Sequence, residues 1–264
     1  LDFDLDGLLD VYVINYVENG QLLYDSQGAA IGFAHDCYDN YFYRNNGNLT
    51  FTEMTAEAGL SDNGCALAVA TTDYDNDGDT DLYVANDFGQ WLPPNALFAN
   101  DTEQGTFQNV GPETGADIGL FGMGIAVGDY DHDSDLDYYV TNLGRNVLLQ
   151  NDGTGNFTDA TTPAGVENTN GPDGELATGW GAAFIDYDND TYEDLFVANG
   201  WIFAAPFINT SNDDPSKMYH NNGDGTFTDV SDMAGFNDLA KNRGLAYADY
   251  DDDGDLDIVM PTLS

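Results

Sequence analysis

The stretch Asp73-Tyr-Asp-Asn-Asp-Gly-Asp-Thr-Asp81 decides the fold of this chain. It places five aspartates in nine residues, and the apolar run Leu82–Ala85 follows directly. Two unit charges about 4 Å apart repel by about 1 kcal/mol in water and by several times more near a protein surface. Carboxylates at alternate positions, with a Gly that turns the backbone inward, are what a hard cation with oxygen ligands requires. We therefore interpret this loop as a calcium site.

The same nine-residue pattern occurs five times, starting at Asp2, Asp73, Asp129, Asp186 and Asp249. Aspartate stands at positions 1, 3, 5 and 9 of every copy. The starts recur at intervals of about 60 residues, and a fixed motif at such a period indicates a repeat architecture. A solvated acidic turn that binds no metal is the alternative, and it becomes weak when all five copies must be explained.

The three middle loops are surrounded by the same four apolar segments, whereas the first copy lacks the segment before its loop and the fifth lacks the third and fourth segments. A Gly/Ala-rich segment precedes the loop, a segment ending in Asn follows it, a third runs into an Asn/Asp/Gly turn, and a fourth carries a Phe. In the second copy these are Ala66–Ala70, Leu82–Asn86, Ala96–Asn100 and Phe107–Val110. Four short antiparallel strands per repeat make the blade of a β-propeller. We predict an all-β protein, a β-propeller of four-stranded antiparallel blades.

The repeats predict one propeller segment over residues 1–264, with four to five blades. The expected bounds are a partial blade at 1–60, blades at 65–115, 119–166 and 176–236, and the first half of a fifth blade at 242–264. Both ends fall in the same half of the repeat. We therefore expect part of a larger propeller, or one completed by strands of another chain. Helical turns are expected only at Val230–Gly235 and Asp238–Asn242.

The composition restricts the classes of partner. The formal net charge is −43 with only five basic residues, so the chain repels nucleic acid and anionic membrane surfaces. No run of 18 apolar residues occurs, which argues against a membrane span. The aromatic content and the strict repeats argue against disorder. A halophilic surface would scatter its carboxylates, whereas 20 of the 48 acidic residues, four in each of five loops, fall on the repeated positions.

The chain has two cysteines, Cys37 and Cys65. Their spacing, across a blade boundary, is compatible with one disulfide, but the sequence alone does not establish the pairing. Calcium sites that fill at millimolar concentration suit an extracellular setting. We expect a secreted or cell-surface protein.

The strings Gly179–Asp190, Asn221–Val230 and Arg243–Asp257 resemble the FG-GAP/VCBS repeats, nearest to the cartilage-acidic-protein and UnbV-type group. The resemblance covers essentially the whole chain. It implies a propeller, commonly seven-bladed, with Ca²⁺ in an Asp-x-Asp-x-Asp-Gly-x-x-Asp loop between the first two strands of each blade, as in integrin α subunits. It also implies an extracellular protein that acts in adhesion or surface binding.

The resemblance further implies that positions 1, 3, 5 and 9 supply carboxylate ligands and position 7 a backbone carbonyl. These residues are Asp2, Asp4, Asp6, Leu8 and Asp10; Asp73, Asp75, Asp77, Asp79 and Asp81; Asp129, Asp131, Asp133, Asp135 and Asp137; Asp186, Asp188, Asp190, Tyr192 and Asp194; and Asp249, Asp251, Asp253, Asp255 and Asp257. Ser134 and Thr191 replace the Gly at position 6, which adopts positive φ most easily. We expect the fourth site to be strained, weaker or differently turned, because β-branched residues resist that region.

Other metal sites fit the loops less well. An EF-hand needs a Glu at position 12 and flanking helices, whereas position 12 here is Val or Met within a strand-like run. Many anionic oxygens favour calcium over magnesium. Zinc and copper prefer clustered His and Cys, and His35, His132 and His220 are isolated in the sequence. We predict up to five Ca²⁺, about one per loop, whose binding is coupled to folding.

The sequence also carries predictions about function. No Gly-x-Ser-x-Gly, His-Glu-x-x-His or P-loop motif occurs, which predicts that the chain is not an enzyme. A carboxylate pair for glycoside hydrolysis is a weaker alternative. Insertions after the second strands carry the aromatic residues Trp91, Trp201, Phe203 and Phe207. If exposed, they indicate contact with a protein or glycan at a cell surface or matrix; packing over a blade is equally compatible. A homo-oligomer or a filament built by strand addition is the remaining alternative.

Overall fold

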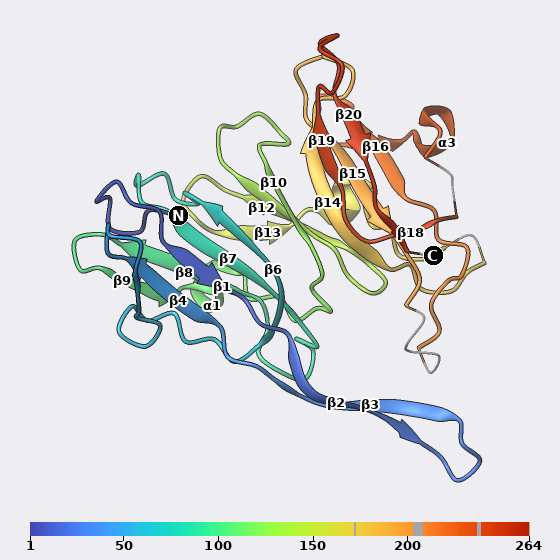
Figure 1. Ribbon diagram of the computed structural model, residues 1–264. Helices are drawn as coiled ribbons and strands as arrows, with labels where there is room; N and C mark the ends of the chain where they lie inside the picture. Colours follow the sequence, from blue (N-terminus) through green and yellow to red (C-terminus); the bar gives the residue numbers. More distant parts are fainter. Residues whose placement is uncertain (172, 203–207, 237–238, 264) are drawn as a thin grey trace. The chain divides into compact units, whose positions relative to one another are not determined.

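The computed structural model of the protein describes residues 1–171, 173–202, 208–236 and 239–263 (Figure 1). Strands are the main elements within these ranges, and three helices of four residues each accompany them. Contacts between residues group the chain into two compact units. The first unit contains Leu1–Gln21, Phe33–Gly122 and Asp152–Phe157, and the second contains Leu22–Gly32, Met123–Asn151 and Thr158–Ser264.

Sheets of four antiparallel strands in chain order form three blades of the described chain (Figure 1). Blade 2 contains β6 (Cys65–Thr72), β7 (Asp81–Asp87), β8 (Ala96–Asp101) and β9 (Thr106–Asn109). Blade 3 contains β10 (Ile125–Gly128), β11 (Asp137–Val140), β12 (Val147–Asn151) and β13 (Phe157–Asp159), and blade 4 contains β14 (Gly179–Ile185), β15 (Asp194–Asn199), β16 (Lys217–Asn221) and β17 (Phe227–Asp229). This topology is that of β-propeller blades. The predicted fold class is confirmed.

The first and last repeats contribute smaller sheets. In blade 1, β1 (Val11–Val13), β4 (Tyr41–Asn45) and β5 (Phe51–Glu53) pair in the order β1-β4-β5. The segment expected as an insertion after β1 forms a hairpin of β2 (Val17–Tyr24) and β3 (Ala30–Cys37). In the last repeat, β19 (Ala246–Ala248) pairs with β20 (Asp257–Val259), and β18 (Lys241–Asn242) pairs with β21 (Thr262–Leu263).

Three short helices follow the last strands of blades 2, 3 and 4 in the described chain. They are α1 (Gly111–Thr114), α2 (Thr161–Ala164) and α3 (Ser231–Ala234), and each ends at a Gly whose φ is 81°. Only the third was expected, because four residues are too few to show a helical period. The helical turn expected at Asp238–Asn242 is wrong where it is described, since Lys241–Asn242 is a strand. None of the described helices has the length and apolar character needed to cross a membrane.

Alternation along β15 shows why the second strands read as continuous apolar runs. Leu195 and Val197 belong to a buried cluster shared with β11 and β12, whereas Phe196 and Ala198 belong to a second cluster on the opposite face. Successive side chains of a strand point to opposite faces of a sheet. Both faces of blade 4 are therefore buried at this strand, which requires apolar residues at every position.

The Gly- and Ala-rich first strands have a steric cause. At Gly124, directly before β10, an added Cβ atom would lie 2.1 Å from the carbonyl oxygen of Trp180 in β14. Such a distance is far below van der Waals contact, so the backbones of blades 3 and 4 approach too closely here for any side chain. In the first unit, Phe3 and Phe42 belong to one buried hydrophobic cluster, and their ring centroids lie 4.9 Å apart.

Candidate metal centres in the acidic loops

The first aspartate of each loop organises the turn through the backbone. In the second loop, Asp73 Oδ1 accepts a hydrogen bond from the N–H of Asp77 (3.1 Å) and Asp73 Oδ2 accepts one from Gly78 (3.1 Å). Asp77 Oδ1 in turn accepts from the N–H of Asp79 at 2.8 Å. All five loops contain these three bonds. The five acidic loops therefore share one backbone conformation.

The ninth aspartate connects its loop to the third strand of the blade. Asp81 is 1% exposed, and it accepts hydrogen bonds from the N–H groups of Tyr74 (3.1 Å) and Asn100 (2.8 Å). Burial raises its pKa to about 7, although the two N–H donors oppose the shift. Burial likewise raises the pKa of Asp137 to about 8 and that of Asp194 to about 6. Positive charge beside these carboxyls would favour their ionised form.

The donor set fits a hard cation. Asp4 Oδ1 and Asp131 Oδ1, both at position 3, are buried and accept no hydrogen bond. Carboxylate oxygens of positions 1, 3 and 9 lie within 4.8 Å of one another in the second and third loops. Burial, followed by the charge of Asp77, raises the pKa of Asp75. Converging anionic oxygens, some of them without a donor, match the oxygen coordination of Ca²⁺, and the metal identity stays a prediction.

Backbone dihedrals show what the loops demand of positions 4 and 6. Ser134 and Thr191 have φ of 78° and 79°, in the same region as Gly78 at 91°, and the fourth loop keeps the shared hydrogen bonds. The alternative of a different turn in the fourth loop is therefore wrong, and the strain remains. Position 4 also has positive φ, for example 59° at Asn76, which sequence analysis missed. Asn or Asp stands there in three loops and was the available signal.

A second missed position is the residue before the recurring Asn near the end of the third strand, which is Asn45, Asn100, Asn151 and Asn221 in blades 1 to 4. The residue at this position is Arg44, Ala99, Gln150 and His220 in blades 1 to 4. Arg44 Nη2 lies 2.6 Å from Asp4 Oδ2, and Gln150 Nε2 donates to Asp131 Oδ2 at 2.5 Å. His220 Nδ1 lies 3.4 Å from Asp188 Oδ2 and 3.2 Å from Asp194 Oδ1, so this histidine is not isolated as expected. In the first, third and fourth loops this position places a different polar group against the carboxylate of position 3.

The aromatic candidates have different surroundings. Trp91 is 72% exposed, and its ring lies edge-on to Phe121 with centroids 5.4 Å apart. Trp201 is half-buried, and Lys241 Nζ lies 5.0 Å from its ring centroid. Phe203 and Phe207 lie outside the described residues. Trp91 is thus the candidate with a free aromatic surface.

The disulfide that the sequence left open is formed. Cys37 at the end of β3 is bonded to Cys65 at the start of β6, with Cα atoms 4.7 Å apart. Close by, Tyr16 donates a hydrogen bond to Asp87 at 2.6 Å. The base of the β2–β3 hairpin is therefore fixed to blade 2 by a covalent and a polar contact.

Comparison with known proteins decides the family. The model of the FG-GAP-like repeat matches residues 2–84, 73–140, 132–197 and 202–260. This chain belongs to the FG-GAP-like repeat family. Cartilage acidic protein 1 from Xenopus tropicalis and from Homo sapiens are each 26% identical over 276 aligned positions, which cover all of this chain and 38% and 37% of the relatives. The FG-GAP chain therefore spans less than two fifths of these curated relatives.

Weak matches among solved structures include a lectin and rhamnogalacturonan lyases. One is an Agrocybe aegerita lectin described as specific for non-reducing terminal N-acetylglucosamine (TM-score 0.42, 14% identity, 96% of this chain and 60% of that chain). Another is a rhamnogalacturonan lyase of Bacillus licheniformis (TM-score 0.41, 16% identity, 97% and 54%).

The prediction that the chain is not an enzyme is contradicted by these neighbours, because three of the similar structures are rhamnogalacturonan lyases. The prediction failed because it excluded only the few reaction classes that have short sequence motifs. The three lyase structures are only 12% to 16% identical to the FG-GAP chain and have TM-scores below 0.5. No substrate or activity of this chain is therefore inferred from them.

Proposed function

We propose that this chain is a calcium-stabilised binding module of an extracellular protein, whose acidic loops each hold one Ca²⁺ and whose partner is a protein or a glycan. The observation that carries the proposal is the repeated geometry within the chain: five loops with the same hydrogen bonds, in which anionic oxygens converge and two buried oxygens lack a donor. When bound, calcium would supply the positive charge that lets these carboxylates stay ionised together.

The loops would make folding depend on the metal. The four described loops that have both flanking strands join the first and second strands of a blade, for example β6 to β7 and β14 to β15. Repulsion between the carboxylates of a loop opposes the pairing of those two strands. A ligand that binds only the folded state adds about 2.7 kcal/mol of stability per site when its free concentration is a hundred times Kd. Loop occupancy would therefore control the stability of each blade.

The extracellular part of the proposal is supported by the Cys37–Cys65 disulfide, since disulfides persist mainly in oxidising compartments. Cartilage acidic protein 1, a relative with a similar repeat region, has a name that is consistent with this setting. Trp91 is the residue we assign to partner contact, because large exposed aromatic surfaces mark interaction sites.

The test is thermal unfolding in excess CaCl₂, in excess MgCl₂ and in EDTA, with calcium titrated calorimetrically into the stripped protein. We expect a large fall in Tm in EDTA, recovery with CaCl₂ and little recovery with MgCl₂. The loop variant Asp75→Asn should lose one equivalent of calcium, whereas Glu103→Gln, an exposed acid outside the loops, should bind the same number as the unchanged protein. An unchanged Tm in EDTA would remove the calcium proposal.

A further inference from the structure

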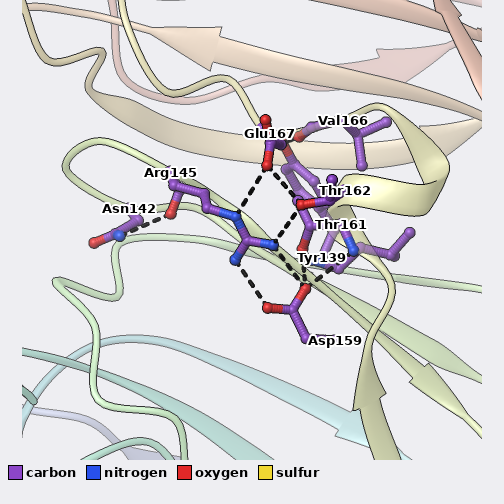
Figure 2. A network of polar contacts seen from close by, with 9 residues as sticks. Tyr139, Asn142, Arg145, Asp159, Thr161, Thr162, Val166 and Glu167 are labelled. Atoms are coloured by element: carbon purple, nitrogen blue, oxygen red, sulfur yellow. Dashed lines mark hydrogen bonds and ion pairs between the residues drawn. The ribbon is translucent and has the colours of Figure 1, made fainter.

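An ion-pair network in blade 3 shows that the end of a blade can hold a guanidinium group (Figure 2). Arg145 Nη1 lies 2.8 Å from Asp159 Oδ2, and Nη2 lies 2.9 Å from Asp159 Oδ1. Glu167 Oε1 lies 3.4 Å from Arg145 Nε, and the N–H of Thr161 donates to Asp159 Oδ1 at 3.0 Å. The last strand and the first residue of α2 thus orient a carboxylate for a two-pronged contact with arginine.

Blades 2 and 4 have other residues at the corresponding places. In blade 4 the acid is Asp229, and Lys217 Nζ lies 2.9 Å from its Oδ2. In blade 2 the equivalent of the acid is the neutral Asn109, and Pro94 stands where Arg145 stands in blade 3. Blades 3 and 4 thus each pair a last-strand acid with a cation of the chain, and blade 2 has neither an acid nor a cation at the equivalent positions.

Blade 1 breaks this pattern. Glu53 ends the last strand, and its Oε1 accepts from the N–H of Thr55 at 2.8 Å, as Asp159 accepts from Thr161. The position equivalent to Arg145 is Asp39, and among the described residues no basic side chain forms an ion pair with Glu53. The hydrogen bonds of Thr55, chiefly that of its hydroxyl, lower the pKa of Glu53. Glu53 is therefore an ionised, correctly oriented carboxylate without a cation.

The equivalence of the two places rests on a shared contact. Thr55 Oγ1 accepts from the N–H of Phe42 at 2.8 Å, and Thr161 Oγ1 accepts from the N–H of Leu148 at 2.8 Å. In blade 3 the residues bonded to Arg145 are Asp159, Thr162 and Glu167. Their blade 1 equivalents Glu53, Ala56 and Ser61, together with Asp39, Tyr41 and Asp62, line a pocket of about 340 Å³. Blade 1 keeps the surroundings of the guanidinium and contains a pocket at that place. Blade 4 has a pocket of about 310 Å³ at the corresponding place beside Lys217 and Asp229, so what distinguishes blade 1 is the missing cation and not the pocket itself.

We propose that the pocket of blade 1 binds an arginine side chain supplied by another protein. Glu53 provides the two-pronged acceptor, as Asp159 does for Arg145, and Asp39 adds a second negative charge at the rim. The net charge of −43 attracts a basic partner from a distance. A Ca²⁺ ion fits less well, because Asp62, the most buried acid here, already accepts from Gly64, Asn40 and Asn86.

The experiment uses the isotope-labelled chain in saturating CaCl₂, so that the acidic loops are filled. A short Gly/Ser peptide with one arginine is titrated, and the same peptide with citrulline, which keeps the shape without the charge, is the matched control. We expect saturable NMR shifts of the amides of Glu53 and Thr55 with the arginine peptide and none with the citrulline peptide. A lysine peptide should bind more weakly, because an ammonium group makes no two-pronged contact.

Two variants test the pocket itself. Glu53→Gln should weaken the arginine peptide by about tenfold or more, since it removes the charged acceptor. Asp39→Arg should place a guanidinium beside Glu53, as Arg145 lies beside Asp159, and should abolish peptide binding while the chain stays folded by Tm. The control Glu103→Gln should bind like the unchanged chain.

The proposal is overturned if the citrulline peptide binds as well as the arginine peptide, if the Asp39→Arg variant still binds the arginine peptide fully, or if the NMR shifts are confined to the acidic loops. Displacement of the peptide by additional CaCl₂ at constant ionic strength would make the pocket a metal site instead.

Discussion

At the scale of single residues, the side chain before the third-strand Asn differs in charge from one acidic loop to the next. Arg44 contacts two carboxylates of the first loop, with Nη2 at 2.6 Å from Asp4 and 3.6 Å from Asp6. Ala99, the equivalent residue at the second loop, has neither charge nor a hydrogen-bonding group in its side chain. A guanidinium in the first loop repels a divalent cation and competes for the same oxygens. The loops are therefore unequal although their aspartates are the same.

Exchanging these side chains should change calcium affinity in opposite directions. We expect Arg44→Ala to strengthen calcium binding in the first loop by about fivefold, since a partly exposed ion pair contributes up to about 1 kcal/mol. Ala99→Arg should weaken the second loop by a similar factor. Calorimetric calcium titrations of the two variants measure this. If both variants bind calcium as the unchanged chain does, the residue before the third-strand Asn does not modulate calcium affinity.

Repetition made the loop aspartates predictable, whereas the residues that modify them were not. Asp at positions 1, 3, 5 and 9 recurs in five copies, so each copy supports the others. Arg44 differs from its equivalents Ala99 and Gln150, and its contact with Asp4 depends on the pairing of β1 with β4 across the β2–β3 hairpin. Glu53 and Asp39 also escaped notice, because their significance appears only beside the Arg145 network of another blade.

At the scale of elements, the β2–β3 hairpin shows how a segment expected only as an insertion acquires structure. Asp25 Oδ1 accepts from the N–H groups of Gln27 (2.8 Å) and Ala29 (2.9 Å) and so forms the turn. At the base, the ring of His35 lies 4.1 Å from that of Phe88, and Tyr16 bonds to Asp87. Only the turn uses neighbours in sequence. The contacts that hold the base join segments far apart in the chain and cannot be inferred from local patterns.

The Tyr16–Asp87 bond predicts a pH-dependent stability. Burial raises the pKa of Asp87 to about 6, although the bonds from Tyr16 and the Phe88 N–H oppose this. The folded state holds the proton more tightly than the unfolded state, so this group's stabilising effect is present below about pH 4 and is lost as the pH rises through 6. Removing the Tyr16 hydroxyl raises the pKa further and increases that loss.

Tyr16→Phe should therefore lower the free energy of unfolding by about 1–2 kcal/mol at pH 7.5 and by about 0.5–1 kcal/mol at pH 5. Urea unfolding in saturating CaCl₂ at the two pH values measures the difference. Tyr24→Phe, at an exposed position of the same hairpin, is the matched control and should change neither value. An equal loss for Tyr16→Phe at both pH values would show that the charge of Asp87 plays no part.

At the scale of the whole molecule, the distribution of charge governs stability. The sequence carries 48 acidic and five basic residues, and Arg44, Arg145 and Lys217 already form ion pairs with acids of the chain. Five Ca²⁺ would add ten positive charges, which changes −43 to about −33. The gain is concentrated where repulsion is strongest, in loops with four carboxylates each. Calcium and simple salt should therefore relieve the same repulsion by different means.

Because calcium and salt would relieve the same repulsion, we predict that Tm depends on the NaCl concentration differently with and without calcium. In EDTA, raising NaCl from about 0.05 M to about 0.5 M shortens the screening length from above about 10 Å to about 4 Å and should raise Tm by several degrees. In saturating CaCl₂ the repulsion inside the loops is already neutralised, and salt also weakens calcium binding, so Tm should stay level or fall. Choline chloride in place of NaCl separates screening from binding of Na⁺ in the loops. An equal rise of Tm in both buffers would mean that repulsion over the general surface, and not within the acidic loops, limits the stability of the fold.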